Sequence, residues 1–220
     1  MQDHPPSRDA GSELDPAAKP ARPPIPWVCG ALILASVSVF GAERALHVDA
    51  PELGALFGPL VAAGQWWRLL SYGVVHAGLL HLGVNMFMTV SLGVPIERRL
   101  GSVRFLQTTL VAGLGGAAFP LIFAPKNPVV GASAIIFGWA GAIVPLLDRR
   151  NVRQFGSWLL LNLLFSLLPG ISLAGHLGGF VFGLGCGALL RWQAPRFSML
   201  APLLAALAGG AALIAAYRGG

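Results

Sequence analysis

Four polar side chains interrupt the apolar stretches of this chain at spacings that could support catalysis. His81 and Asn85 are four residues apart, so they share one helix face and lie one turn from each other. Ser133 lies near the start of the apolar segment GASAIIFGWAGA, and His176 lies in AGHLGGFVFG. A serine within reach of a histidine forms a nucleophile with its general base. An asparagine and a second histidine nearby could donate hydrogen bonds to a developing oxyanion.

Each of these residues alone also has a structural explanation. A serine in a membrane helix can bond back to its own backbone, and a histidine can bond between two helices. Such side chains are costly in lipid, however, and together they favour a functional site. The nine acidic residues lie in the N-terminal region, in the first loop or at the ends of apolar runs, so none is placed to hold the His176 ring. We therefore expect a Ser–His dyad oriented by packing, with Phe137 on the Ser133 face as a flat surface.

The composition places these residues in a membrane protein. Hydrophobic residues make up 55% of the 220 residues and charged residues only 11%, whereas soluble domains carry about 25% charged residues. A polytopic membrane protein needs no polar cover, because lipid is its solvent. The net charge of +6 does not indicate nucleic acid binding, since the basic residues form no aromatic-interleaved patch. The two cysteines lie in apolar runs and indicate no disulfide framework or metal site, and no cofactor is implied.

The hydropathy pattern predicts an all-α bundle of six helices followed by a seventh. Residues 1–26 are rich in proline and should form a disordered cytoplasmic tail. We expect the six-helix bundle over residues 27–192, and an additional transmembrane helix with a short tail over 196–220. The predicted helices are 27–42, 79–97, 105–124, 132–147, 155–168, 174–190 and 198–217.

The fourth predicted helix is too short to cross a bilayer, since its length is about 24 Å. If the charged residues after Leu147 hold its end at one surface, Ser133 stops inside the membrane. Irregular backbone at that depth is tolerated only where it is buried in protein or lines a water-filled cavity. The short helix therefore predicts a cavity beside Ser133.

The distribution of Lys and Arg predicts a cytoplasmic N-terminus. In that orientation eleven basic residues fall in cytoplasmic segments and four in outside segments, which agrees with the positive-inside rule. Ser133, His176, His81 and Asn85 then all lie in the outer half of the bilayer. We expect a multi-pass protein of a bacterial inner membrane.

Taken together, these motifs resemble those of the rhomboid intramembrane serine proteases. The matching pieces are GQWWRLLSYGVVHAGLLHLGVNMF, GVPIERRLG, GASAIIFG and GHLGGFVFG, which lie within residues 64–187. The resemblance implies that Ser133 is the nucleophile and His176 its base. It also implies an oxyanion hole formed by Asn85, His81 and the Ser133 backbone N–H.

The resemblance extends to supporting residues. Trp67 and Arg68 match a Trp-Arg element of the first outer loop, and Glu97 with Arg98 matches an element that suggests a structural ion pair. A glycine stripe at four-residue steps after His176 would let another helix approach closely. The supporting residues expected on these grounds are Gly131, Phe137, Gly179, Gly183, Trp67 and Arg68.

Two positions depart from the family pattern. Ala134 stands where glycine often follows the serine, and its methyl group could crowd the sixth helix or the substrate. Phe137 stands where tyrosine is common, which keeps the ring and loses a hydroxyl. Neither change removes the nucleophile, so the resemblance implies an active enzyme.

The function expected is acyl transfer to water on transmembrane segments of membrane proteins, which would enter from lipid between the second and fifth helices. Two alternatives stay open. A catalytically silent rhomboid-like binder would keep the fold but lose the serine or the histidine, and both are present. A small transporter often shows internal repeats, and the sequence has none.

Overall fold

The structure is a computed structural model that describes residues 25–49, 52, 54–168 and 170–219. The predicted tail, 1–26, lies outside the described residues except for its last two. Among the described residues the regular structure is helical, apart from an isolated antiparallel bridge between Leu56 and Val129. The chain is therefore an all-α polytopic membrane protein.

Within the described residues, five helices are long and apolar enough to cross a membrane by length and composition. A sixth apolar helix, Ser133–Leu146, is shorter, as predicted. The elements are α1 (Trp27–Leu46), α3 (Gly58–Ala62), α4 (Arg68–Ser71), α5 (Leu79–Met88), η1 (Thr89–Gly93), α6 (Val94–Leu100), α7 (Ser102–Phe123), α8 (Ser133–Ile143), η2 (Val144–Leu146), α9 (Arg149–Phe165), α10 (Leu173–Trp192), η3 (Ala194–Arg196) and α11 (Phe197–Gly219).

Local chemistry explains several helix ends. Asp148 caps α9, because its carboxylate accepts a hydrogen bond from the Asn151 backbone N–H at 2.8 Å. This helix therefore begins six residues before the predicted apolar run at 155. Ser172 caps α10 in the same way through the Gly175 N–H. The span from α5 to α6 stays continuous through η1, which is a π-helix.

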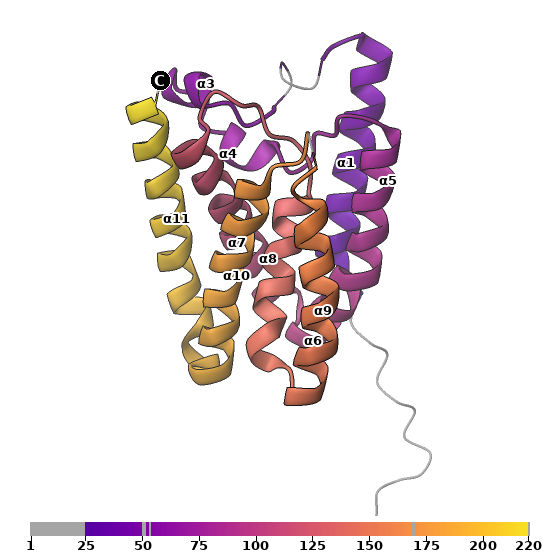
Figure 1. Cartoon of the computed structure of the whole chain (residues 1–220), viewed down its shortest axis with the longest axis vertical. Helices are drawn as coiled ribbons and strands as arrows, with labels where there is room; N and C mark the ends of the chain where they lie inside the picture. Colours follow the sequence, from indigo (N-terminus) through magenta and orange to yellow (C-terminus); the bar gives the residue numbers. More distant parts are fainter. Residues whose placement is uncertain (1–24, 50–51, 53, 169, 220) are drawn as a thin grey trace, which may run out of the picture.

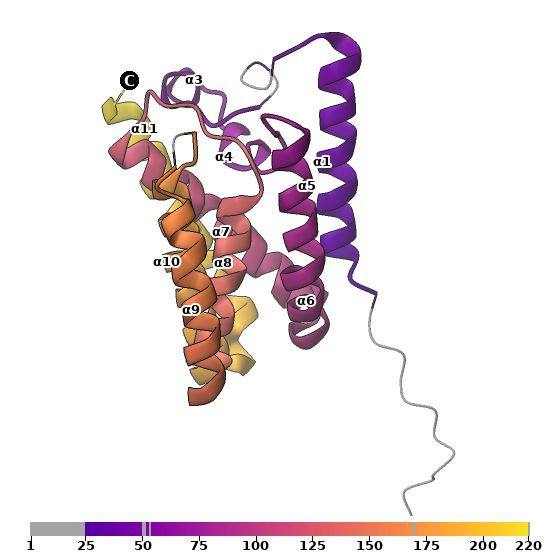
Figure 2. The same cartoon turned by 45° about the vertical axis from the view of Figure 1, so that its right-hand side comes forward.

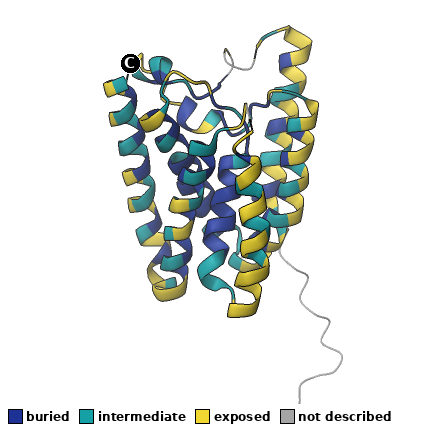
Figure 3. Cartoon of the chain, viewed as in Figure 1, coloured by how far each residue is buried: buried dark blue, intermediate teal, exposed yellow. Residues whose placement is uncertain are grey.

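The helix that carries Ser133 lies inside the bundle (Figure 1). Figure 3 shows α8 buried over most of its length, while α1, α9 and α11 expose much of their surfaces. α8 packs against α10 and α7, and α11 packs against α7. Figure 2 shows α1 and α5 side by side at one edge of the bundle.

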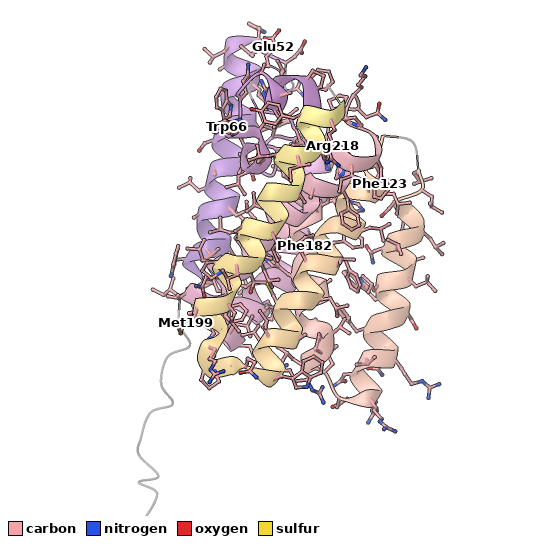
Figure 4. All side chains as sticks on the ribbon, turned by 90° about the vertical axis from the view of Figure 1, so that its left-hand side faces the viewer. Glu52, Trp66, Phe123, Phe182, Met199 and Arg218 are labelled. Carbon is pink, nitrogen blue, oxygen red and sulfur yellow. The ribbon has the colours of Figure 1, made fainter. Side chains whose placement is uncertain are left out.

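The two ends of the bundle differ in structure. The short helices α3 and α4 lie at the end where α1 finishes and the C-terminus lies (Figure 1). Figure 4 places Trp66 and Arg218 near this end and Met199 near the other. α11 therefore runs the length of the bundle, in agreement with a seventh helix that follows the first six.

Close contact between α8 and α10 depends on small residues. A Cβ atom at Gly183 would overlap the backbone carbonyl of Gly138, and one at Gly187 would lie 2.9 Å from the carbonyl carbon of Ala142. The two helices therefore meet backbone to backbone along the predicted stripe. This contact fixes the residues at the start of α8 against those at the start of α10.

Candidate active site

Ser133 and His176 are in direct contact. Ser133 is the first residue of α8 and His176 is the fourth of α10. The Nε2 atom of His176 lies 2.7 Å from Oγ of Ser133. This distance is within the range of about 2.6–3.2 Å over which a general base can take a proton from a hydroxyl. His176 is 6% exposed, whereas Ser133 is half-buried, so protein shields the histidine and leaves the serine partly accessible.

The His176 ring is held from one face by Phe137. The two rings stack with centroids 4.3 Å apart and planes inclined by 13°. Phe137 lies one turn after Ser133 on the same face of α8, so the spacing in the sequence predicts this stacking.

A second contact to the ring was not predicted from the sequence. Oγ of Ser166 lies 2.6 Å from Nδ1 of His176. Ser166 is the C-cap of α9 and is 2% exposed. The expectation that packing alone orients the ring is therefore wrong, because a hydroxyl group bonds to its far nitrogen. The sequence signal for this contact is a single polar residue, Ser166, between Phe165 and Leu167.

Asn85 and His81 face the loop that leads into α8. Gly131 has φ of +112°, a left-handed conformation that glycine adopts easily. A Cβ atom there would lie 2.7 Å from two atoms of the His81 ring and 3.8 Å from Nδ2 of Asn85. The glycine two residues before Ser133 thus leaves room for both side chains.

Hydrogen-bond donors gather at this point. The first N–H groups of a helix have no partner within the helix, and α8 begins with Ser133. Nδ2 of Asn85 donates to the His81 carbonyl oxygen at 2.8 Å, and a carboxamide nitrogen carries a second N–H. The region can therefore direct N–H groups towards an oxygen atom beside Ser133. The cavity predicted beside Ser133 stays a prediction.

His76 stacks edge-on against the His81 ring, with centroids 5.2 Å apart. Burial, with a smaller contribution from His81, lowers the pKa of His76 to about 4. The His76 ring is therefore neutral at neutral pH and adds no charge beside the site.

The methyl group of Ala134 lies against Gly116 of α7. A Cβ atom at Gly116 of α7 would lie 2.6 Å from the Cβ atom of Ala134, so the methyl group fills the space that Gly116 leaves. Gly179 of α10 instead faces the Ala134 backbone. The sequence suggested that this methyl group could crowd the sixth helix. It does not do so at Gly179 of that helix.

Arg68 is the first residue of the short helix α4 and Trp67 is its N-cap, so both lie in the segment between α1 and α5. The buried Arg68 guanidinium donates to Oε1 of Gln65 and to the carbonyl oxygens of Ala55 and Glu52, at 2.7, 2.7 and 3.2 Å. Burial lowers the pKa of this guanidinium. Trp67 is 58% exposed. Arg68 therefore holds the loop together, while Trp67 presents its ring to the surroundings.

Glu97 acts at the opposite end of the bundle. Its carboxylate accepts hydrogen bonds from the backbone N–H groups of Val28 and Cys29, both at 2.9 Å, and from the Ser102 hydroxyl at 2.6 Å. The first turn of α1 has no side-chain cap of its own. Glu97 therefore caps α1 from another helix, a role different from the ion pair with Arg98 that the sequence suggested.

Residues 63–193 match the Rhomboid domain. The chain belongs to the rhomboid family. The matched segment contains every predicted site residue, from Trp67 to Gly183.

Several rhomboid proteins are similar to this one. It is 37% identical to Rhomboid protease GluP of Bacillus subtilis over 145 residues, which cover 62% of this chain and 28% of that protein. It is 32% identical to RHOMBOID-like protein 6, mitochondrial, of Arabidopsis thaliana over 152 residues, 64% of this chain and 50% of that protein. It is 32% identical to Rhomboid-like protease 1 of Toxoplasma gondii over 151 residues, 63% of this chain and 52% of that protein. The chain thus spans about half or less of the length of these relatives.

Proposed function

We propose that this rhomboid is an intramembrane serine endopeptidase with Ser133 as nucleophile and His176 as general base. The observation that carries the proposal is the 2.7 Å separation between Oγ of Ser133 and Nε2 of His176. These residues are 43 positions apart in the chain, and both are held by the close contact of α8 with α10. Two of the similar proteins are named proteases.

In the proposed reaction, the Ser133 proton passes to Nε2 of His176 as Oγ attacks the scissile carbonyl carbon. The imidazolium then gives this proton to the leaving amine nitrogen when the C–N bond breaks, which leaves an acyl-enzyme. In the second half, His176 takes a proton from a water molecule as the water oxygen attacks the acyl carbon. The imidazolium then returns this proton to Oγ of Ser133 as the ester bond breaks, which releases the carboxylic acid and restores the enzyme.

The negative charge that forms on the carbonyl oxygen needs donors that are already in place. The Ser133 backbone N–H and the second N–H of Asn85 supply two, and the His81 ring supplies a third. Gly131 supports this arrangement, because a side chain there would overlap the His81 ring.

The proposed substrates are transmembrane segments of other membrane proteins, which enter from the bilayer between α5 and α9. Both helices offer apolar surface to lipid: Leu79 and Leu80 on α5 and Leu160 and Leu164 on α9 are exposed. A helical substrate has to unwind locally, since its amides are hydrogen-bonded and shielded. The catalytic bundle in this proposal is 27–192, and 196–220 is an added helix.

We further propose that the N-terminus is cytoplasmic and that the membrane is a bacterial inner membrane. The excess of basic residues at the end of the bundle that holds Arg98, Arg149 and Arg191 supports this orientation. The exposed Trp66 and Trp67 then lie at the outer interface, where tryptophan side chains are favoured.

The decisive experiment uses the full-length protein in proteoliposomes with a membrane-anchored reporter substrate and, separately, a fluorophosphonate probe. The native protein should cleave the reporter and be labelled at Ser133. Ser133→Ala should lose both activities, and His176→Ala should lose cleavage, with thermal stability near that of the native protein in each case. A native protein that binds the reporter without cleaving it or reacting with the probe would instead be a catalytically silent rhomboid.

A further inference from the structure

Ser166 is the buried end of a helix whose other residues are exposed or half-buried. No residue of α9 between Arg149 and Phe165 is buried, whereas Ser166, the C-cap, is 2% exposed. A hydroxyl group removed from water is costly unless it is hydrogen-bonded. Ser166 has two such partners, the carbonyl oxygen of Asn162 at 3.0 Å and Nδ1 of His176 at 2.6 Å.

The chemistry of these partners fixes the direction of each bond. A serine hydroxyl has one proton to donate and lone pairs to accept with. The Asn162 carbonyl oxygen can only accept, so it takes the Ser166 proton. The lone pairs of Oγ are then left for Nδ1 of His176, which must carry the proton in this bond.

The resulting tautomer is the one that a general base needs. A neutral imidazole carries one N–H, so a protonated Nδ1 leaves a lone pair on Nε2. Nε2 is the nitrogen 2.7 Å from Oγ of Ser133. The opposite tautomer would point an N–H at the serine and could not accept its proton.

We propose that Ser166 is a positioning residue that holds His176 in the base-competent tautomer and orientation. The inference rests on the proposed function and adds a third member to its dyad. The hydrogen bonds run in one direction, from the Ser133 hydroxyl to His176, from His176 to Ser166, and from Ser166 to the Asn162 carbonyl oxygen. Ser166 takes the place that an aspartate holds in other serine proteases, but without its charge.

Three substitutions separate the hydroxyl group from its volume. Ser166→Ala removes the hydroxyl group, Ser166→Thr keeps it and adds a methyl group, and Ser166→Val has the shape of threonine without the hydroxyl. Ser157→Ala is the matched control, because Ser157 also lies on α9 and bonds back four residues, to the Arg153 carbonyl oxygen, but is exposed.

The measurements are kcat and KM for the reporter substrate and the rate of fluorophosphonate labelling of Ser133. Loss of one neutral hydrogen bond should lower kcat and the labelling rate by about tenfold in Ser166→Ala, with KM unchanged. Ser166→Thr should exceed Ser166→Val by a similar factor, and Ser157→Ala should match the native protein. The small probe does not require a transmembrane segment to enter the bundle, so equal effects on both rates indicate a change in the dyad itself.

A spectroscopic measurement reads the tautomer directly. In protein labelled with ¹⁵N-histidine, with His176→Ala used for assignment, Nδ1 of His176 should be protonated in the native protein and Nε2 unprotonated. In Ser166→Ala the two nitrogens should show a mixture of tautomers. A merely structural role for Ser166 would lower stability and leave these signals unchanged.

Several outcomes would overturn the inference. Equal rates for Ser166→Ala and the native protein would do so, as would equal losses in the threonine and valine variants, or a native ring protonated at Nε2. If the native protein neither cleaves nor reacts with the probe, the proposed function fails and the positioning role fails with it. If the native protein is active and Ser133→Ala is not, while every Ser166 variant matches the native protein, only the role of Ser166 is refuted.

Discussion

Alanine in place of Gly179 would force a methyl group against the backbone of α8. The added Cβ atom would overlap the Ala134 carbonyl oxygen and lie 2.8 Å from its carbonyl carbon. Non-bonded carbon atoms prefer about 3.5–4.0 Å, so α10 has to move away from α8 by about 1 Å at this level. Gly179 lies one turn from His176, and Ala134 is adjacent to Ser133, so the movement acts directly on the dyad.

The expected consequence is a loss of activity larger than the loss of stability. A shift of about 1 Å would lengthen the 2.7 Å contact between Ser133 and His176 beyond the range for proton transfer, about 2.6–3.2 Å. Misplacement of this size typically costs about 10²-fold in rate, so kcat/KM of Gly179→Ala should fall by about that factor. The overpacking itself should lower the free energy of unfolding by about 1–3 kcal/mol.

Two other glycines of α10 provide controls. A Cβ atom at Gly187 would lie 2.9 Å from the Ala142 carbonyl carbon, so Gly187→Ala should destabilise the fold similarly. It lies about 16 Å along the helix from His176, so its kcat/KM should fall much less. A Cβ atom at Gly185 would lie 3.7 Å from Cδ1 of Leu204, an ordinary van der Waals distance, so Gly185→Ala should be active and no less stable.

The assay is kcat/KM in proteoliposomes, with thermal unfolding of the same preparations. Native activity in Gly179→Ala would refute the reasoning. So would equal activity losses at Gly179 and Gly187 in proportion to unfolding, since the glycines would then hold the bundle together without setting the dyad geometry.

Three further substitutions or deletions test other parts of the molecule. Asn85→Ala should lower kcat by at most about 10²–10³-fold, because other donors remain; a change in KM with kcat unchanged would argue against an oxyanion role. Glu97→Gln should lower the free energy of unfolding by about 1–3 kcal/mol, since a carboxamide has one acceptor oxygen and its NH2 group would face the other of the two N–H groups of Val28 and Cys29; a denaturation curve that matches the native one would contradict this. Deletion of residues 1–21 should leave kcat/KM unchanged, because their composition supports no core, and an inactive but folded protein would disprove it.

The helices could be predicted from the sequence because apolar runs and charged interruptions are local signals. The residues at which the helices begin and end were less predictable. The first apolar run finishes at residue 42, yet α1 continues through Glu43 and Arg44 to Leu46, where His47 adopts a left-handed conformation with φ of +54°. Charged residues end an apolar run without ending a helix.

The candidate site was predictable as far as its residues share a helix or carry a family motif. Phe137 and Ser133 are one turn apart, so their common face follows from helical geometry. The contact between Ser166 and His176 joins the end of one helix to the start of another, and no spacing in the chain encodes it. The direction of the Ala134 methyl group likewise depends on where Gly116 of α7 lies, which only the packed bundle determines.

The π-helical segment Thr89–Gly93 makes the second span tolerant of a change in length at one place. Glu97 is twelve positions after Asn85, and in a continuous α-helix, at about 100° per residue, the two side chains would point about 120° apart. A π-turn takes up about one extra residue, which brings the two directions to within about 20° of each other. Both side chains are in fact buried, Asn85 beside Gly131 and Glu97 at the start of α1. Related chains that lack one residue within this segment could therefore keep both contacts by forming an ordinary α-helix, because eleven steps of about 100° leave the two side chains within about 20° of each other.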